Sequence, residues 1–303
     1  MALKEYERVK MLEIPETGVI DLVLDTDAYT EVDDPFAIAY ALLSPERINL
    51  LALYAAPFAM NERAQDPADG MEMSYNEILN ILNLCHMQRP AFRGSKRYLA
   101  DKGEPVDSPA ARDLIERSKA YSKEHPLYVV AIGASTNVAS ALLMDETLCE
   151  RIVVIYLGGN DLDLHPNTYN VYQDVKAAQV VFDCGVPLIH MPCDPVSKIL
   201  ITGMPELRAC IGGKNALCDY LVRIVGEYGE DHFAWGKTIW DISTIALLVN
   251  PSWTRSGLTP SPIITDQLTY SRDITRHLIR NVASLDRDAI FRDLFRKLAG
   301  VKD

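Results

Sequence analysis

Short apolar runs alternate with helical patterns along most of the chain. Strand-length apolar runs fall at residues 19–24, 49–56, 89–94 (a short strand and turn), 127–133, 151–157 and 187–192. Helical periodicity follows them at residues 35–43, 71–84, 108–122, 137–143 and 175–182. Strands buried on both faces read as continuous apolar runs, and strand–helix alternation is typical of parallel sheets. We therefore predict an α/β fold: a mostly parallel, doubly wound, Rossmann-like sheet flanked by helices.

The rest of the chain is less regular. Residues 57–70 form a polar segment that is longer than an ordinary connection, which favours a lid or site loop. Residues 204–229 read as helical, and a polar loop follows at 230–236. The C-terminal segment is mixed before an amphipathic helix at 288–298. Because no repeat or linker divides the sequence, we predict a single domain over residues 1–303.

The most unusual stretch follows the first predicted strand. Five carboxylates occur within ten residues, at Asp25, Asp27, Glu31, Asp33 and Asp34. Repulsion between like charges a few ångströms apart raises pKa values and costs stability unless a cation compensates it. An all-oxygen cluster selects a hard cation, calcium or magnesium. Asp33 or Asp34 can cap the next helix, but capping does not explain the others. The stretch therefore predicts a metal site at a strand's carboxyl end, where open α/β sheets bind ligands.

Composition and charge exclude several classes of protein. The chain has 303 residues, 48% of them hydrophobic, and a formal net charge of −12. Such a charge argues against non-specific nucleic-acid binding. No apolar run reaches the length of a membrane span, and the N-terminus lacks the apolar centre of a signal peptide. The six cysteines show no CxxC or zinc spacing, so we expect free thiols. These features predict a cytoplasmic protein that binds neither nucleic acid nor membranes.

Four polar clusters follow apolar runs. They are the acidic stretch, residues 133–137, residues 158–160 with Asn170 and Asp174 beyond, and Trp240 with Asp241. In a parallel sheet, strand ends converge on one edge, so residues far apart in the sequence can share a pocket. Four such clusters, one of them of the metal type, favour a single binding site over four solvated loops.

Several motifs occur in one order from about Val19 to Leu298. They are Asp25-Thr26-Asp27 with Asp33-Asp34, Gly133…Ser135-Thr136-Asn137-Val138-Ala139, Tyr169-Asn170…Asp174…Ala177-Ala178 before Gly185-Val186-Pro187-Leu188, Trp240-Asp241, and the segment Ser284 to Phe291. Because it carries these motifs in this order, the chain resembles the inosine–uridine-preferring nucleoside hydrolase family. The acidic block combined with the late Asp241 is the most specific part of the resemblance.

The resemblance implies calcium-dependent hydrolysis of the N-glycosidic bond of a ribonucleoside or related N-riboside, releasing base and ribose. It implies that Asp27, Asp34 and Asp241 bind the ion through carboxylates and Thr136 through its main-chain carbonyl. Asp27 would also deprotonate the water on the ion, and Asp33 and Asn170 would grip ribose hydroxyls. The chemistry agrees, because departure of the base leaves an electron-poor, oxocarbenium-like sugar that carboxylates stabilise.

The chain also departs from the family pattern. Its acidic block is longer and contains Glu31, and Thr168 replaces a common Glu. Residues 55–58 lack the Asn found there in the family. Trp240 stands where many members have a His that protonates the leaving base; indole cannot act as that acid, but it can stack on a base. These features indicate a variant branch, with Trp-Asp in place of His-Asp, whose specificity is altered.

Further residues are candidates for substrate contact. His232 and His165 could replace the missing acid, although a solvated loop histidine is the competing interpretation. Asn160 follows a Gly pair that lets backbone approach a ligand, and Glu31 and Trp240 could also touch substrate. We expect a small nucleoside-like substrate and a homo-oligomer, a dimer or tetramer.

Two other functions compete with this one. Asp25-Thr26-Asp27 resembles the nucleophile motif of haloacid-dehalogenase-type phosphatases, which use magnesium. That motif has no use for Asp33 and Asp34 or for the late Trp-Asp pair. The second alternative is a catalytically silent protein that binds calcium and ribose or a nucleoside.

Overall fold

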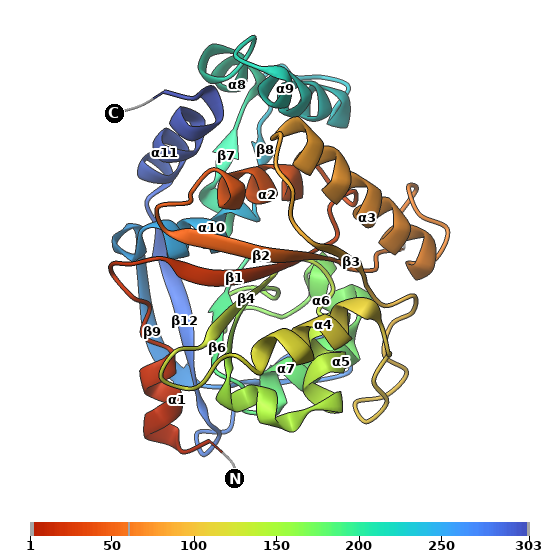
Figure 1. The fold of residues 1–303 in the computed structure, drawn as a ribbon, viewed down its shortest axis with the longest axis vertical. Helices are drawn as coiled ribbons and strands as arrows, with labels where there is room; N and C mark the ends of the chain where they lie inside the picture. Colours follow the sequence, from red (N-terminus) through yellow and green to blue (C-terminus); the bar gives the residue numbers. More distant parts are fainter. Residues whose placement is uncertain (1–2, 60, 302–303) are drawn as a thin grey trace.

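An eight-stranded sheet forms the centre of the computed structural model (Figure 1). Its strands are β1 (Ile20–Thr26), β2 (Ile48–Ala55), β3 (Ala91–Arg93), β4 (Leu127–Ala131), β5 (Ile152–Leu157), β6 (Leu188–Met191), β9 (Thr254–Pro260) and β12 (Leu278–Leu285). They lie in the order β3–β2–β1–β4–β5–β6–β12–β9, and all neighbours are parallel except β12 with β9. The predicted mostly parallel α/β sheet is confirmed.

The structure describes residues 3–59 and 61–301. The first two residues of the N-terminal segment, Met60 in the predicted polar loop, and the last two residues of the predicted domain lie outside this description. Within it, no helix combines the length and the apolar content that a membrane span requires.

Helices cover both faces of the sheet. One face carries α2 (Asp34–Leu42), α3 (Pro67–Leu84) and α10 (Ile242–Val249), with α8 (Met204–Cys210), α9 (Ala216–Tyr228) and α11 (Arg287–Ala299) beyond them. The other carries α4 (Pro109–Ser118), α5 (Thr136–Met144) and α7 (Val175–Asp183). Figure 1 shows α2 and α3 on the opposite side of the sheet from α4, α5 and α7. In β1, Leu22 and Leu24 pack into the first core and Val23 into the second. This two-sided burial explains the continuous apolar runs.

The remaining elements are short. They are helices α1 (Glu5–Met11) and α6 (Tyr169–Gln173), the 3-10 turns Glu146–Glu150, Ser197–Ile199 and Pro251–Trp253, and the paired strands β7 (Ile201–Thr202) with β8 (Lys237–Thr238) and β10 (Ile263–Ile264) with β11 (Tyr270–Ser271). The sequence pattern did not identify α6, because five residues are too few to show a helical period.

Capping residues explain where two helices differ from the prediction. Helix α3 begins before residue 71, because Asp66 accepts hydrogen bonds from the amides of Ala68 and Asp69 and Pro67 occupies the first turn. The predicted helix at 204–229 is divided into α8 and α9. Asn215 caps the second of these by accepting from the Cys218 amide. The apolar periodicity continues across this break, so the pattern did not reveal it.

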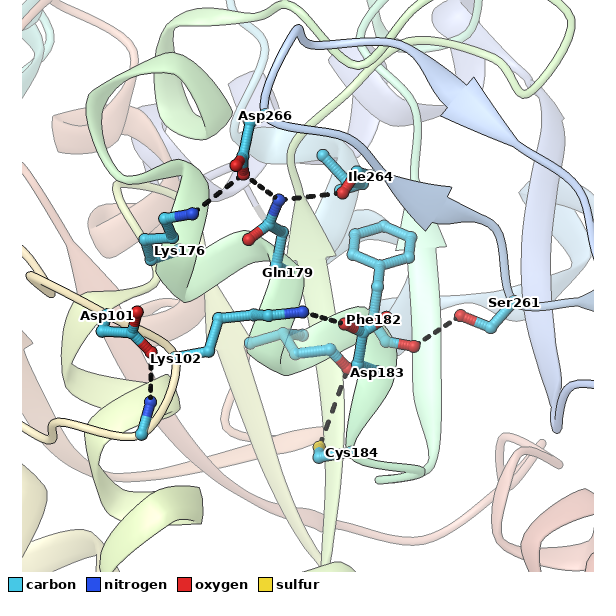
Figure 2. Close-up of polar contacts among 12 residues, drawn as sticks. Asp101, Lys102, Lys176, Gln179, Phe182, Asp183, Cys184, Ser261, Ile264 and Asp266 are labelled. Carbon is cyan, nitrogen blue, oxygen red and sulfur yellow. Dashed lines mark hydrogen bonds and ion pairs between the residues drawn. The ribbon is translucent and has the colours of Figure 1, made fainter.

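The C-terminal segment, which reads as mixed, supplies two strands of the sheet. Strand β12 pairs with β6 in parallel and with β9 in antiparallel orientation. The outer strand β9 is largely exposed, so it lacks the apolar run that marks a buried strand. Figure 2 shows how the segment before β12, which carries the hairpin of β10 and β11, is held against α7. There, Asp266 accepts from Lys176 and Gln179, and Ser261 donates to the Phe182 carbonyl.

The chain changes direction within the sheet beside β1. Strands β2 and β3 extend from one side of β1, and β4 lies on its other side. The loops that leave the carboxyl ends of β1 and β4 therefore diverge, which opens a crevice at that edge.

Candidate active site

A pocket lies at this edge of the sheet, among the loops that follow four of the strands. Its lining residues are Asp27, Thr30, Glu31, Asp33 and Asp34 after β1, Ile132 after β4, Leu157 and Asn160 at and after β5, Thr168, Tyr169 and Asn170 around the start of α6, Cys193 and Asp194 after β6, and Trp240 and Asp241 before α10. Parallel strands bring their carboxyl ends together, so residues separated by more than half of the chain meet here.

Four buried aspartates face one another in the pocket. One carboxylate oxygen from each of Asp33, Asp34 and Asp241 lies within 4.8 Å of the others. Burial, followed by repulsion from neighbouring carboxylates that include Asp27, raises the pKa values of Asp34 and Asp241 well above their usual range. Burial also raises the pKa of Asp27 to about 7 and that of Asp33 to about 6. The site therefore concentrates negative charge that the protein alone stabilises poorly.

This cluster fits a bound divalent cation. Within residues 3–59 and 61–301, Asp33 is the one aspartate of the cluster that forms a salt bridge. Its partner is Lys237, whose Nζ lies 4.0 Å from Asp33 Oδ1. No salt bridge joins Asp27, Asp34 or Asp241 to a basic side chain in that part of the chain. The donors are carboxylate oxygens, which hard cations such as calcium prefer. A cation of this kind would supply the missing positive charge.

Local contacts hold the aspartates in place. The hydroxyl of Thr26 donates to Asp34 Oδ1, and Asp34 opens α2, where a carboxylate is favoured at the helix N-terminus. The Trp240 amide donates to Asp33 Oδ2 over 3.1 Å. That bond links the loop after β1 to the segment before α10. A direct hydrogen bond therefore joins the two segments that supply the aspartates of the cluster.

Gly133 gives Asp27 its space. A Cβ atom at residue 133 would lie 2.8 Å from both Cγ and Oδ1 of Asp27, closer than van der Waals contact allows. We expect Gly133→Ala to displace the Asp27 carboxylate and to lower kcat by about 100-fold, because misplacing a catalytic group by about 1 Å has an effect of this size. Steady-state kinetics, with circular dichroism to monitor folding, would measure it.

Gly257 provides the matched control. A Cβ there meets no atom within 4 Å, so Gly257→Ala should leave kcat within about twofold of the wild type. Equal activity of the two variants would show that the close approach of Gly133 to Asp27 has no catalytic consequence.

Five of the six predicted substrate-binding residues line the pocket: Glu31 and Asp33 in the acidic stretch, and Asn160, Asn170 and Trp240 outside it. The amide of Asn170 donates to the carbonyls of Ile132 (2.8 Å) and Leu157 (2.9 Å), so its oxygen remains available to a ligand. The Oδ1 of Asn160 accepts from the Asp194 amide over 3.0 Å. Trp240 is half-buried and lines the same pocket. Backbone contacts therefore fix the two asparagine side chains, which suits groups that orient a substrate.

Lys237 was not identified by the sequence pattern. Its ammonium group is almost fully buried, forms an ion pair with Glu31, and lies over the ring of Tyr228 at 4.8 Å. Asp33 and Glu31 raise its pKa above the usual lysine value, against the effect of burial. Glu31 itself lines the pocket. The extra carboxylate of the long acidic block is therefore held by a lysine that only tertiary contacts bring near.

Three residues predicted from the sequence, Thr136, His232 and His165, lie outside the pocket lining. Thr136 is buried at the start of α5, where its hydroxyl donates to Asp174 Oδ2 over 2.7 Å. His232 packs against the ring of Trp235, with 5.1 Å between ring centroids. His165 lies nearer, since its Nδ1 is 3.3 Å from Asn160 Nδ2, but it does not line the pocket either.

A buried hydrogen-bond network supports the site from below. The amide of Asn137 donates to Asp25 Oδ1 (2.7 Å) and to the Ala55 carbonyl, and its oxygen accepts from Ser95. This network ties together β1, β2 and the loops after β3 and β4. Asp25 is therefore a structural residue of the acidic stretch, whereas its neighbour Asp27 faces the pocket.

Several lining residues were not identified from the sequence. Ile132, Leu157 and Cys193 are apolar or weakly polar and resemble core residues, and Tyr169 and Asp194 belong to no acidic run. Their common signal is position, because each stands at or just beyond the carboxyl end of a strand or at the start of α6. Counting strand-end positions irrespective of residue type would have found Ile132, Leu157 and Cys193.

The chain is similar to known nucleoside hydrolases. The family model described as inosine-uridine preferring nucleoside hydrolase matches residues 22–288. The probable uridine nucleosidase 2 of Arabidopsis thaliana is 24% identical over 277 residues, which cover 84% of this chain and 81% of that protein. The pyrimidine-specific ribonucleoside hydrolase RihA of Enterobacter sp. (strain 638) is 26% identical over 264 residues, covering 77% and 80%. A solved plant nucleoside hydrolase, the PpNRh1 enzyme, superposes with a TM-score of 0.73 at 20% identity and covers 94% of this chain and 99% of its own.

Proposed function

Because this chain belongs to the inosine-uridine preferring nucleoside hydrolase family, we propose that it hydrolyses the N-glycosidic bond of a ribonucleoside or related N-riboside. The products are the free base and ribose, and the reaction depends on calcium. The observation that carries this proposal is the meeting of Asp27, Asp33, Asp34 and Asp241 in one buried pocket. Family membership also argues against the phosphatase alternative.

The aspartates divide into ion ligands and a ribose contact. Asp27, Asp34 and Asp241 lack a basic partner in residues 3–59 and 61–301, so we assign them to the calcium ion. Asp33 has Lys237 as its own counter-charge, at 4.0 Å, and we assign it to ribose hydroxyls together with Asn170. A bound calcium ion lowers the pKa of a water in its shell and orients it.

The main-chain ligand is assigned to Ile132 in place of Thr136. The Ile132 residue lines the pocket, and its carbonyl accepts from the pocket residue Asn170. Thr136 belongs to the first turn of α5 and does not line the pocket. A carbonyl oxygen has two lone pairs, so the bond from Asn170 leaves one free for a cation.

Asp27 acts as the general base. It is buried, and its Oδ2 lies 3.5 Å from Gln173 Nε2, at the limit of a hydrogen bond, so this oxygen is free to accept a proton from the attacking water. The other carboxylates favour the positive charge that develops on the sugar ring. The reaction therefore needs the same negative charge that destabilises the ion-free site.

A panel of nucleosides tests the proposal. Release of reducing sugar is measured for uridine, cytidine, inosine and adenosine with calcium and with a chelator, beside calorimetric binding of ribose. Calcium-dependent sugar release supports the hydrolase. Heat of ribose binding without sugar release from any nucleoside would identify a silent binding protein, and release of phosphate from sugar phosphates would identify a phosphatase.

Calcium should stabilise the protein more strongly as the pH rises. Folding raises the pKa values of Asp27 and Asp33 to about 7 and about 6. A raised folded-state pKa stabilises the protein at low pH, and that contribution is lost as pH increases through the folded-state value. The ion-free protein therefore loses stability as the pH rises from the ordinary aspartate value of about 4 to the folded-state values of about 6 and 7, and calcium offsets this loss by competing with protons.

Thermal unfolding with calcium and with a chelator measures this effect. With calcium at 1,000 times its Kd, the stabilisation is about 4 kcal/mol. We expect the calcium-induced rise in Tm to be much larger at pH 8 than at pH 5. An equal rise at both values would show that the aspartates do not release protons when the ion binds.

A further inference from the structure

The pocket contains no obvious acid for the leaving base. Its described lining residues include six carboxylates but no histidine, lysine or arginine. When a neutral base departs from ribose with the bonding electrons, its ring nitrogen becomes negative and needs a proton or an equivalent donor. These six carboxylates outnumber the four positive charges that a calcium ion, Lys237 and Lys198 would supply, so the lining opposes that negative charge. The composition of the lining is therefore unfavourable to a leaving group that departs as an anion.

The weaker acids in the lining are already engaged. The Tyr169 hydroxyl donates to the Ala59 carbonyl over 2.6 Å and accepts from Asn61. Burial raises the pKa of the Cys193 thiol to about 12, so it holds its proton at neutral pH. Asp194 forms an ion pair with Lys198, whose side chain is exposed to solvent. None of these groups is arranged to protonate a base.

Three other basic side chains around the pocket are also unsuited to this role. Lys237 is held between Glu31 and Asp33 and is therefore strongly protonated. His232 packs on Trp235, outside the lining. His165 contacts the amide of Asn160, which already fastens the loop after β5. The pocket supplies an aromatic surface, Trp240, and an excess of negative charge.

We propose that the preferred substrates are N-ribosides whose base carries a fixed positive charge, such as pyridinium ribosides and N7-alkylated purine ribosides. This inference rests on the proposed N-glycosidic hydrolysis. Such a base departs as a neutral molecule and needs no proton. A cationic ring is also attracted by the carboxylates and by the face of an indole such as Trp240. The features that disfavour an anionic leaving group thus favour a cationic substrate.

The reaction balances without an acid. Water oxygen forms a bond to the anomeric carbon, and the carbon–nitrogen bond breaks. Its electron pair goes to the ring nitrogen and neutralises the positive charge of the base. The water proton goes to Asp27 and then to solvent, so the products are ribose, the neutral base and one released proton.

Matched substrates separate charge from size. Inosine and 7-methylinosine differ by one methyl group and one charge, and nicotinamide riboside tests a smaller cationic ring. p-Nitrophenyl riboside is neutral but needs no acid, because its leaving group is a weak base. We expect kcat/KM for 7-methylinosine to exceed that for inosine by at least about 100-fold, the size of a missing acid's contribution. We also expect KM for 7-methylinosine to rise with salt, and KM for p-nitrophenyl riboside to stay constant, because salt screens charge attraction.

The outcomes are distinct. Hydrolysis of inosine and 7-methylinosine at similar kcat/KM overturns the inference and leaves the proposed function standing. Fast turnover of p-nitrophenyl riboside with slow turnover of both cationic substrates also overturns it, because charge would then be no advantage. Failure to hydrolyse any of the four ribosides overturns the proposed function itself.

Two variants sharpen the test. Trp240→His places an ionisable imidazole in the lining, and we expect it to raise the ratio of inosine to 7-methylinosine kcat/KM by at least about tenfold. His232→Gln should leave this ratio unchanged, because His232 lies outside the lining. A selective loss of inosine hydrolysis in His232→Gln would identify His232 as the acid and contradict the inference.

Discussion

Asp27→Asn will lower kcat by about 1,000-fold and leave the protein folded, because removing a general base costs about 100- to 10,000-fold. The amide has almost the same shape as the carboxylate but cannot accept the proton of the attacking water. It also removes one of four mutually repelling charges, so the ion-free protein should not lose stability. Single-turnover and steady-state kinetics on the best substrate, with thermal unfolding of the same sample, measure both effects.

Asp21→Asn is the matched control for this prediction. Asp21 lies on the same strand β1 but near its other end, where it accepts hydrogen bonds from Asn49 and Tyr121. This variant should keep kcat within about twofold, since surface substitutions away from a site have small effects. If Asp27→Asn retained wild-type kcat with calcium bound, another group would have to be the base.

Asp241→Ala will weaken calcium binding by more than about 100-fold, since even outer-shell changes at metal sites cost about 10- to 100-fold. Turnover falls with the loss of the ion. The side chain of Asp241 makes no capping hydrogen bond to α10, so the helix loses no cap. Because one repelling charge disappears, the chelator-treated variant should unfold at a higher temperature than the chelator-treated wild type.

Calorimetric titration with calcium, elemental analysis and thermal unfolding test this prediction. Compared with the wild type, Asp241→Ala should have a higher Tm without calcium and a smaller rise in Tm when calcium is added. Asp194→Ala serves as control, because Asp194 lines the same pocket but lies outside the cluster of three aspartates. Full metal occupancy of Asp241→Ala would exclude Asp241 as a ligand.

The acidic stretch shows how far a local pattern predicts a site. Five carboxylates after a buried strand indicated a cation site, and the structure brings Asp33, Asp34 and Asp241 within 4.8 Å of one another. The same pattern could not distinguish Asp25, which supports the site from below through Asn137, from Asp27, which faces the pocket. Alternation along a strand is not visible when both faces of the sheet are buried, because every position is then apolar or satisfied.

Six of the eight strands of the sheet, the longer helices between them and the acidic stretch could be predicted from the sequence by itself, because hydrophobic periodicity and charge density are local properties. Only the tertiary structure decided that Lys237 neutralises Glu31 and Asp33, that Gly133 makes room for Asp27, and that Ile132, and not Thr136, lines the pocket. These contacts join segments that follow different strands. No spacing along the chain records them, because the packing of the sheet and its helices sets which loops meet.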